Sequence, residues 1–244
     1  MIPKDFRRVA AGKTSIIYEK EGIAYKQFYP EYPADWIAHE VAVQNIVCEH
    51  TTLPVLPVAL ADMPKTISMR YLKGVELEDR MRKDHYKEGI DDLIRLQIEV
   101  HQFVDLPLRQ AHDVLLDQIQ NAPLEAELKA LAIRSLERIA RTTNLCHFDF
   151  HPSNLFFDGI QYYLLDWATA KVGNPVLDIA RTYLLLHQYA FRLSGKYLKQ
   201  IVKRLSLKPD DVYAAIPIMA ALRTFEPDAA PFRETMVRLI KEYS

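Results

Sequence analysis

The chain has 244 residues, of which 49% are hydrophobic and 26% are charged, and its formal net charge is −1. This is the composition of a globular protein with a sizeable core, in one large domain or two small lobes. The near-zero charge excludes a global attraction to nucleic acid or to an anionic membrane, and we expect neither as a partner. Two distant cysteines do not make a secreted disulfide framework, and neither a signal peptide nor a membrane span is evident, so we expect a cytoplasmic protein. Nothing in the sequence indicates an oligomeric state.

Residues 7–28 predict a small β-meander. Residues 15–18 form one strand and residues 23–28 the returning strand, with Glu21 and Gly22 in the turn between them. Apolar and aromatic residues dominate both runs, as is typical of strands in a half-buried sheet.

The loop ahead of this hairpin contains Gly12, Lys13 and Thr14. It is not a Walker loop, because Arg7 stands where that pattern needs its first glycine and because a strand follows it instead of a helix. Such a loop can still place backbone N–H groups over phosphates, as the Gly-rich loop of kinases does. A plain hairpin loop is the alternative interpretation.

Lys26 lies in the middle of the second strand, in the apolar context AYKQF. An ammonium group on a half-buried strand needs an anion, and in a kinase that anion is a nucleotide phosphate. Residues 33–48 predict a helix that begins at Pro33, and Glu40 within it is our candidate partner for Lys26. A solvent-facing lysine and an exposed helix acid are the alternative.

Two further strand regions follow, at residues 53–60 and 66–72, and Gly74 ends the second one. We expect this break to separate a nucleotide-binding N-terminal lobe, 1–73, from a helical C-terminal lobe, 74–244, that carries the catalytic loop and the acceptor site. Adenine would bind at the break through backbone groups of Arg70 to Leu72, which leave little trace in side chains.

The stretch 146–167 contains His147, Asp149, Asn154 and Asp166. The last three follow the order of a kinase site, in which an aspartate faces the nucleophile, an asparagine binds the metal and a later aspartate binds the metal as well. A two-residue turn at Asp158-Gly159 predicts a hairpin that returns Asp166 to Asn154. Oxygen ligands from these two side chains suit magnesium. The alternative is that Asp149 and Asn154 are ordinary turn residues and that His147 is a buried polar residue of the core.

The segment after Asp166 predicts a helix start, with Asn174 as the cap and Pro175 at the first helical position. Asp178 then lies in the first turn, where the helix dipole favours a carboxylate. We expect it to be structural and to bond backbone N–H groups of the catalytic loop.

The motif HFDFHPSN, followed by LLDWATAKVGNPVLDIART, resembles the aminoglycoside phosphotransferase and choline kinase superfamily. The pattern of that superfamily is roughly H-G-D-x-H-x-x-N, then I-D-W or I-D-F, then G-x-P-x-x-D-x-A. The strong match covers residues 146–181, and residues 7–74 match in order and type only. The resemblance implies an α+β, bilobal protein-kinase-like fold with a small β-rich N-lobe and a larger, mostly helical C-lobe.

The resemblance also implies roles for individual residues and two cofactors, ATP and magnesium. These roles are the catalytic base at Asp149, magnesium ligands at Asn154 and Asp166, loop-shaping residues at His147 and His151, and a phosphate-orienting ion pair of Lys26 and Glu40. The implied activity is transfer of the γ-phosphate of ATP to a hydroxyl of a small molecule. Two features depart from the family: Phe148 stands where it usually has glycine, and the nucleotide loop has a single glycine.

The charge balance bears on the acceptor. From Thr182 onward the chain has ten lysines and arginines against six acids, which favours a sugar or another metabolite over a polycationic aminoglycoside. Two rivals are a catalytically silent nucleotide-binding module and an aminoglycoside resistance kinase proper. A protein kinase is disfavoured, because only a few residues separate Trp167 from Pro175 and leave no room for an activation segment.

Overall fold

The computed structural model describes residues 5–244, which form two compact units. The first unit comprises residues up to 85 together with 152–169, and the second comprises 86–151 and 170–244. The units differ in extent from the predicted lobes, since the hairpin after Asn154 packs with the N-terminal segment. The division at residues 73 and 74 stays a prediction.

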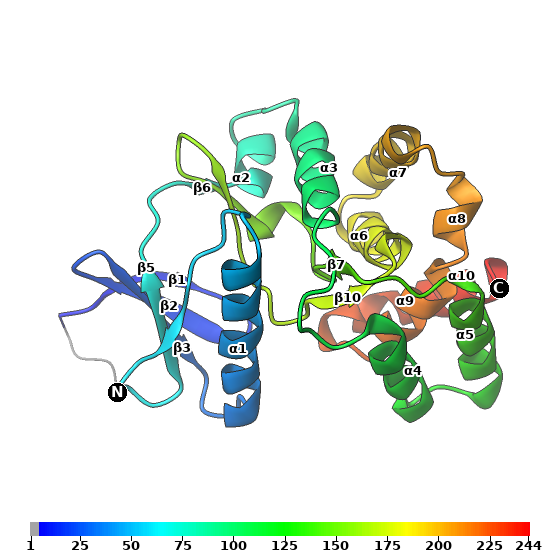
Figure 1. The fold of residues 1–244 in the computed structure, drawn as a ribbon, viewed down its shortest axis with the longest axis horizontal. Helices are drawn as coiled ribbons and strands as arrows, with labels where there is room; N and C mark the ends of the chain where they lie inside the picture. The colour runs from blue at the N-terminus through cyan, green and yellow to red at the C-terminus, as the bar shows by residue number, and fades with distance from the viewer. Residues whose placement is uncertain (1–4) are drawn as a thin grey trace. The chain divides into compact units, whose positions relative to one another are not determined.

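The first unit is built on a five-stranded antiparallel sheet, in the order β1-β2-β3-β5-β4. Figure 1 labels β1, β2, β3 and β5 of this sheet. Its strands are β1 (Arg7–Ala11), β2 (Ser15–Lys20), β3 (Ile23–Phe28), β4 (Ala59–Leu60) and β5 (Thr66–Arg70). The predicted meander is confirmed. Of the predicted strand at 53–60 only the last two residues pair, because Pro54 and Pro57 have no N–H to donate to a ladder.

Helix α1 (Ala34–His50) packs on this sheet through Ile37, which meets Phe28 of β3 and Ile67 of β5 in a small apolar core. The helix begins directly after Pro33, whose extended backbone ends the preceding chain, and Asp35 lies in the first turn. The predicted helix is confirmed. Its packing fixes the face of α1 that carries Glu40.

A second sheet of the first unit has the order β6-β8-β9, with β6 (Val75–Glu76), β8 (Leu155–Phe157) and β9 (Tyr162–Leu164). Helix α2 (Leu77–Arg82) and the short 3-10 helix η1 (Pro152–Asn154) adjoin it. Gly74 permits this pairing: a Cβ there would lie 2.1 Å from the carbonyl oxygen of Phe157. At the predicted break, glycine is therefore needed because the backbones of Gly74 and Phe157 approach each other closely.

The hairpin between β8 and β9 is present, but the prediction of a two-residue turn is wrong. Four residues, 158–161, connect the strands, and of these only Gly159 has a positive φ, 100°. Asp158 closes the loop instead by accepting the N–H groups of Ile160 and Gln161 at 2.8 and 2.9 Å on Oδ1. Because its side chain closes the turn, Asp158 does not need the positive φ that a two-residue turn requires.

The second unit is mostly helical. Its helices are α3 (Gly89–Val100), α4 (Ala111–Asn121), α5 (Ala126–Arg138), α6 (Pro175–Tyr189), α7 (Phe191–Leu205), α8 (Pro209–Tyr213), α9 (Ile216–Arg223), η2 (Pro227–Phe232) and α10 (Arg233–Glu242). A short antiparallel pair, β7 (Asn144–Cys146) and β10 (Lys171–Gly173), joins the two chain segments of this unit. Helix α9 is buried along its length and packs against α5, α6 and α10.

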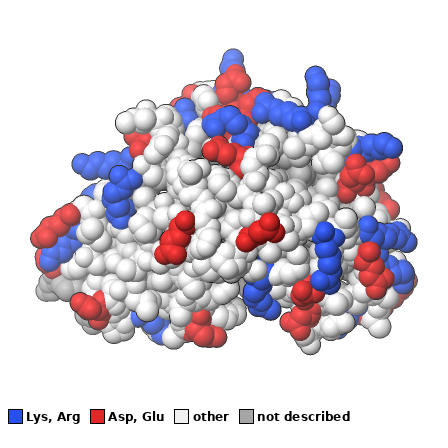
Figure 2. Space-filling view, in the orientation of Figure 1, with Lys and Arg blue, Asp and Glu red and all other residues white. Residues whose placement is uncertain are grey.

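Helix α6 begins as predicted. The side chain of Asn174 accepts the N–H of Val176 at 3.1 Å, and Pro175 occupies the first turn. Among residues 5–244, no helix combines the length and the apolar character needed to cross a membrane. On the face shown in Figure 2, basic and acidic side chains are interspersed.

Candidate active site

Lys26 and Glu40 form an ion pair in the first unit, with 2.6 Å between Nζ and Oε1. Their side chains are 15% and 4% exposed, so the pair is largely shielded from water. Oδ1 of Asp166 lies 4.0 Å from the same ammonium. Burial opposes the charge on Lys26, but the charges of Asp166 and Glu40 outweigh it and raise the pKa of Lys26. The ammonium of Lys26, held between two acidic side chains, therefore stays protonated.

The hairpin brings Asp166 beside Asn154. Leu155 pairs with Leu164, and the N–H of Leu165 donates to the carbonyl of Asn154 at 2.9 Å. Asp166 follows with a φ of 64°, a left-handed backbone conformation that is uncommon for a residue other than glycine. The expected proximity of the two candidate metal ligands is therefore explained by strand register.

Trp167, the residue after Asp166, is held firmly in the core. Its ring is fully buried, and its Nε1 donates to the carbonyl of Leu164 at 3.0 Å. In α1, Nε2 of His39 lies 3.2 Å from the carbonyl oxygen of Ala168. These contacts fix the two residues that follow Asp166.

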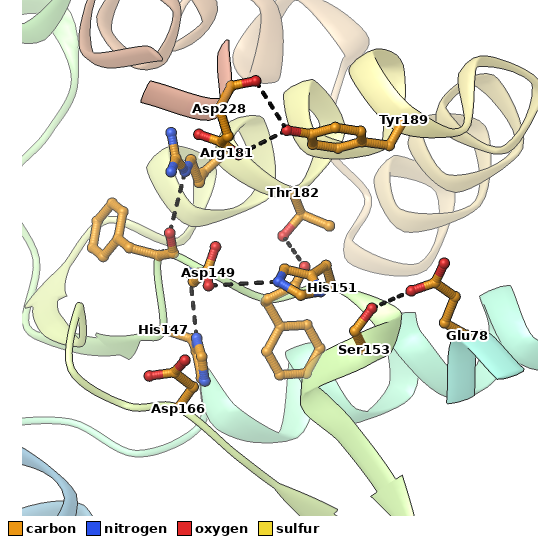
Figure 3. Close-up of polar contacts among 12 residues, drawn as sticks. Glu78, His147, Asp149, His151, Ser153, Asp166, Arg181, Thr182, Tyr189 and Asp228 are labelled. Carbon is orange, nitrogen blue, oxygen red and sulfur yellow. Dashed lines mark hydrogen bonds and ion pairs between the residues drawn. The ribbon is translucent and has the colours of Figure 1, made fainter. Parts of the chain in front are cut away.

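Glu78 is a residue that sequence reasoning missed. It lies on α2, and its carboxylate accepts a hydrogen bond from the hydroxyl of Ser153 in η1 (Figure 3). Ser153 directly precedes Asn154, so the bond fixes the short helix that presents the amide. No local signal could have found Glu78, because 75 residues separate the partners.

Asp149, the candidate base, lies in the second unit with two histidines beside it. Nε2 of His151 is 3.5 Å from its carboxylate, and its backbone N–H donates to Nδ1 of His147 at 3.3 Å (Figure 3). Burial disfavours the charged carboxylate, but the hydrogen bond from His151 and the charges of His151, Arg181 and His147 lower the pKa of Asp149. Asp149 is therefore an ionised carboxylate at neutral pH.

Phe148 takes a left-handed backbone conformation, with φ 61°, and this explains why glycine is usual there in the family that the motif resembles. Asp178 accepts its N–H on Oδ1 at 2.6 Å, and Nε of Arg181 donates to its carbonyl at 3.3 Å. Its ring is buried, with the ammonium of Lys171 4.9 Å from the ring centroid. Three side chains thus hold a conformation that a phenylalanine rarely adopts.

Asp178 is fully buried, and besides Phe148 it bonds Nε2 of Gln97 at 3.0 Å and Nε2 of His101 at 2.8 Å. Burial opposes its charge, but these hydrogen bonds and the charge of His101 lower its pKa. The expected bond from a catalytic-loop N–H to Asp178 is present.

The predicted nucleotide contacts stay predictions. The N–H of Gly12 donates to the carbonyl of Ser15 at 2.8 Å, so this group of the loop is already engaged. In the predicted adenine segment, the N–H of Tyr71 donates to the carbonyl of Gly22 at 2.8 Å, and the guanidinium of Arg70 donates to the hydroxyl of Tyr163 at 2.7 Å. The groups left for contact with a nucleotide are therefore fewer than the sequence indicated. The carbonyl of Thr14 is engaged as well, since it accepts the N–H of Tyr29 at 2.9 Å.

The donor set fits magnesium better than a metal that needs an all-protein cage. Within residues 5–244, no cluster of three or more histidines, cysteines, aspartates or glutamates could hold a metal ion. The carboxylate of Asp166, whose side chain is 45% exposed, and the amide oxygen of Asn154 would supply two hard oxygen ligands. Magnesium typically takes one or two carboxylates and completes its shell with water and substrate phosphates.

Solved structures with similar folds include aminoglycoside and choline kinases. Aminoglycoside phosphotransferase APH(4)-Ia, in a ternary complex with AMP-PNP and hygromycin B, superposes with a TM-score of 0.69 at 14% identity, over 99% of this chain and 94% of that one. Choline kinase LicA from Streptococcus pneumoniae gives 0.68 at 11%, over 98% and 93%. A choline/ethanolamine kinase family protein from Mesorhizobium loti gives 0.64 at 12%, over 98% and 87%. The chain therefore has the kinase-like fold of these enzymes, as predicted.

The family follows from the sequence itself. Residues 25–216 match the model of the phosphotransferase enzyme family, and the chain belongs to that family. The match confirms the predicted resemblance and makes the protein an enzyme of the small-molecule phosphotransferase type. No curated protein matches the sequence significantly.

Proposed function

We propose that this protein transfers the γ-phosphate of ATP to a hydroxyl of a small molecule, with Asp149 as the base. The observation that carries the proposal is the cluster of Lys26, Glu40 and Asp166, a shielded ammonium between two carboxylates, with Asn154 tied to the same hairpin. A structural ion pair would need one acid. The second acid, Asp166, is explained if a magnesium ion and the phosphates of ATP bind beside it.

Chain geometry supports a joint role for Asp149 and the two metal ligands. Asn154 follows Asp149 by five residues, and five residues span at most about 18 Å. The base and the amide therefore stay within reach of one triphosphate and its acceptor, whatever the arrangement of the units.

The proposed chemistry demands little covalent work from the protein. Lys26, kept in place by Glu40, binds phosphate oxygens, and bound magnesium would neutralise charge on the phosphates from Asn154 and Asp166. The acceptor oxygen forms a bond to the γ-phosphorus as the bond to the bridging oxygen breaks and ADP leaves. Asp149 takes the proton of the hydroxyl. Since the pKa of Asp149 is lowered, the proton moves late, when the attacking oxygen has become acidic.

The experiment is magnesium-dependent ADP release with a panel of hydroxyl acceptors, for wild type, Asp149→Asn and the matched control Asp62→Asn, an exposed loop carboxylate. We expect Asp149→Asn to lose at least about a hundredfold in turnover with the affinity for ATP largely kept, since the base acts in the transition state. Asp62→Asn should behave as wild type. Normal turnover by Asp149→Asn would refute the assignment of the base.

The silent-module alternative makes a different prediction. A nucleotide-binding module would bind ATP with magnesium but release no ADP above background with any acceptor. Asp166→Asn separates the role of metal ligand from the role of base. It should raise the magnesium concentration needed for half-maximal turnover, whereas Asp149→Asn should not.

A further inference from the structure

One charged side chain of the second unit has no part in the proposed chemistry. Lys171 lies on β10, in register with Cys146 of β7, and is half-buried. Burial, together with the positive charges of Arg181 and Arg109, lowers the pKa of its ammonium to about 8, whereas Cys146 and Asp178 act in the opposite direction. At neutral pH the ammonium is therefore still mostly charged, in a place that disfavours the charge.

Packing alone does not explain a lysine at this position. A buried ammonium costs free energy that a methionine of similar length would not, and a side chain that only fills space has no use for a charge. The ammonium of Lys171 lies 4.9 Å from the centroid of the Phe148 ring, within the range of a cation–π contact. The charge therefore has a use in which this ring takes part.

Phe148 has a backbone conformation that needs support. Its φ of 61° lies in the left-handed region, which is unfavourable for a bulky residue, and its ring is buried. Asp178 accepts its N–H at 2.6 Å. Nε of Arg181 donates to its carbonyl at 3.3 Å, the contact that leads from Arg181 in Figure 3. Two side chains of α6 thus hold the backbone of Phe148, and Lys171 of β10 adds a hold on the ring.

The conformation of Phe148 decides where Asp149 points. The peptide group that joins the two residues turns with the backbone of Phe148, and the N–H of this group donates to Nδ1 of His147 at 3.3 Å. A phenylalanine that relaxed to a negative φ would rotate the peptide group and move the carboxylate of Asp149 with it. A cation–π contact away from water is comparable in free energy with the cost of one left-handed residue. The ammonium of Lys171 can therefore decide between the two conformations.

Resting on the proposed function, we propose that Lys171 is a positioning residue for catalysis: its ammonium holds the Phe148 ring, and the ring keeps the left-handed conformation that directs the Asp149 carboxylate to the acceptor hydroxyl. This role requires no contact of Lys171 with the nucleotide or the acceptor. Lys171 therefore acts on turnover and not on the affinity for ATP. It also exchanges stability for activity, because the charge that disfavours folding is the charge that holds the ring.

The test measures magnesium-dependent ADP release and urea unfolding of full-chain variants. The acceptors are glucose, ribose, myo-inositol, choline and hygromycin B, and water where none of them is phosphorylated. Lys171→Met should lower kcat at least about tenfold and leave KM for ATP within about twofold, because a misplaced base weakens only the transition state. At about pH 7.5 the variant should be no less stable than wild type, so that unfolding does not explain the loss.

A conservative variant and a surface variant accompany Lys171→Met. Lys171→Arg keeps a cation beside the ring and should retain kcat within about threefold of wild type. Lys199→Met, at an exposed position of α7, should match wild type. Wild-type kcat in Lys171→Met overturns the proposal, and so does an equal loss in a folded Lys171→Arg.

A double-mutant cycle shows whether Lys171 acts through the ring. Glycine adopts the left-handed conformation without support, so in Phe148→Gly the ammonium has nothing to hold. Lys171→Met should therefore lower kcat by less than about twofold in that background, against at least about tenfold in wild type. The same loss in both backgrounds would show that Lys171 acts elsewhere and overturns the proposal. If Phe148→Gly does not fold, Phe148→Leu, which keeps an apolar side chain without a ring, takes its place in the cycle.

These outcomes separate the inference from the proposed function. If the protein is not a phosphotransferase acting through Asp149, ADP release is absent from wild type or is unchanged in Asp149→Asn, and the inference fails with the function. If only the inference is wrong, release depends on Asp149 but not on Lys171, or it depends on Lys171 equally with and without the Phe148 ring.

Discussion

The backbone N–H of Phe148 donates a 2.6 Å hydrogen bond to Oδ1 of Asp178, 30 residues further along the chain. This bond connects the first turn of α6 to the catalytic loop one residue before Asp149. It also explains why a buried carboxylate is kept there, since Asp178 accepts from a backbone group that has a fixed position. Two of our predictions concern this contact.

Asp178→Asn should destabilise the protein by about 3 kcal/mol at neutral pH, because it removes one charge from a buried, hydrogen-bonded set. The pKa of Asp178 is lowered in the folded state, so its stabilisation is complete above the unfolded pKa of about 3.9 and is lost as pH falls through the folded pKa. The difference in unfolding free energy between wild type and Asp178→Asn should therefore become smaller as the pH falls. Urea unfolding at a series of pH values measures it, and a difference that grows in acid would contradict the lowered pKa.

Phe148→Gly and Phe148→Ala separate two opposing effects at one site. Both variants lose a buried ring, which costs about 3–5 kcal/mol, but only glycine also relieves the left-handed backbone, which is worth about 1–2 kcal/mol. We expect both variants to be less stable than wild type, with glycine the better by about 1 kcal/mol. Denaturant titration gives both values. Equal stability of the two variants would mean that Phe148 is not strained.

Local contacts could be predicted from the sequence, and this includes the approach of the two candidate metal ligands along the chain. The cap at Asn174 depends on residues within one helical turn, and the approach of Asp166 to Asn154 depends on one hairpin. The exact loop between the strands could not be predicted, because Asp-Gly is compatible with more than one turn and the side chain of Asp158 selects the longer one. Periodicity and turn residues carry this kind of information.

Long-range partners mostly left no signal. The pair of Glu226 with Arg181 joins residues 45 apart in sequence, and Glu78 with Ser153 joins residues 75 apart. Such contacts depend on how helices pack, which a single sequence does not specify. Lys26 with Glu40 was predictable only because a known chemistry requires a partner for the strand lysine.

Lys26 and Glu40 should behave as one unit in a double-mutant cycle. Lys26→Met and Glu40→Gln each remove the 2.6 Å ion pair, so each should raise KM for ATP about tenfold or more, and the double variant should cost clearly less than the sum. Initial-rate kinetics with varied ATP provide the four values. Strict additivity of the two changes would show that Glu40 does not act through Lys26.

Lys171 should make stability depend on pH in the alkaline range. Burial and the nearby charges of Arg181 and Arg109 lower its pKa to about 8, while Cys146 and Asp178 oppose this. The unfolded chain keeps the proton up to about pH 10.4, so the unfolded state binds more protons between these values and stability rises with pH there.

The comparison of wild type with Lys171→Met isolates this effect, because methionine does not titrate. Allowing for partial exposure of the ammonium, we expect wild type to gain roughly 2 kcal/mol relative to the variant between about pH 7.5 and pH 10.5. At the lower pH the variant should be the more stable, unless the contact of Lys171 with the Phe148 ring, 4.9 Å to its centroid, offsets the cost of the buried charge. Lys199→Met, on an exposed position of α7, is the control and should show no such change. A flat difference across this range would mean that Lys171 titrates as an ordinary surface lysine.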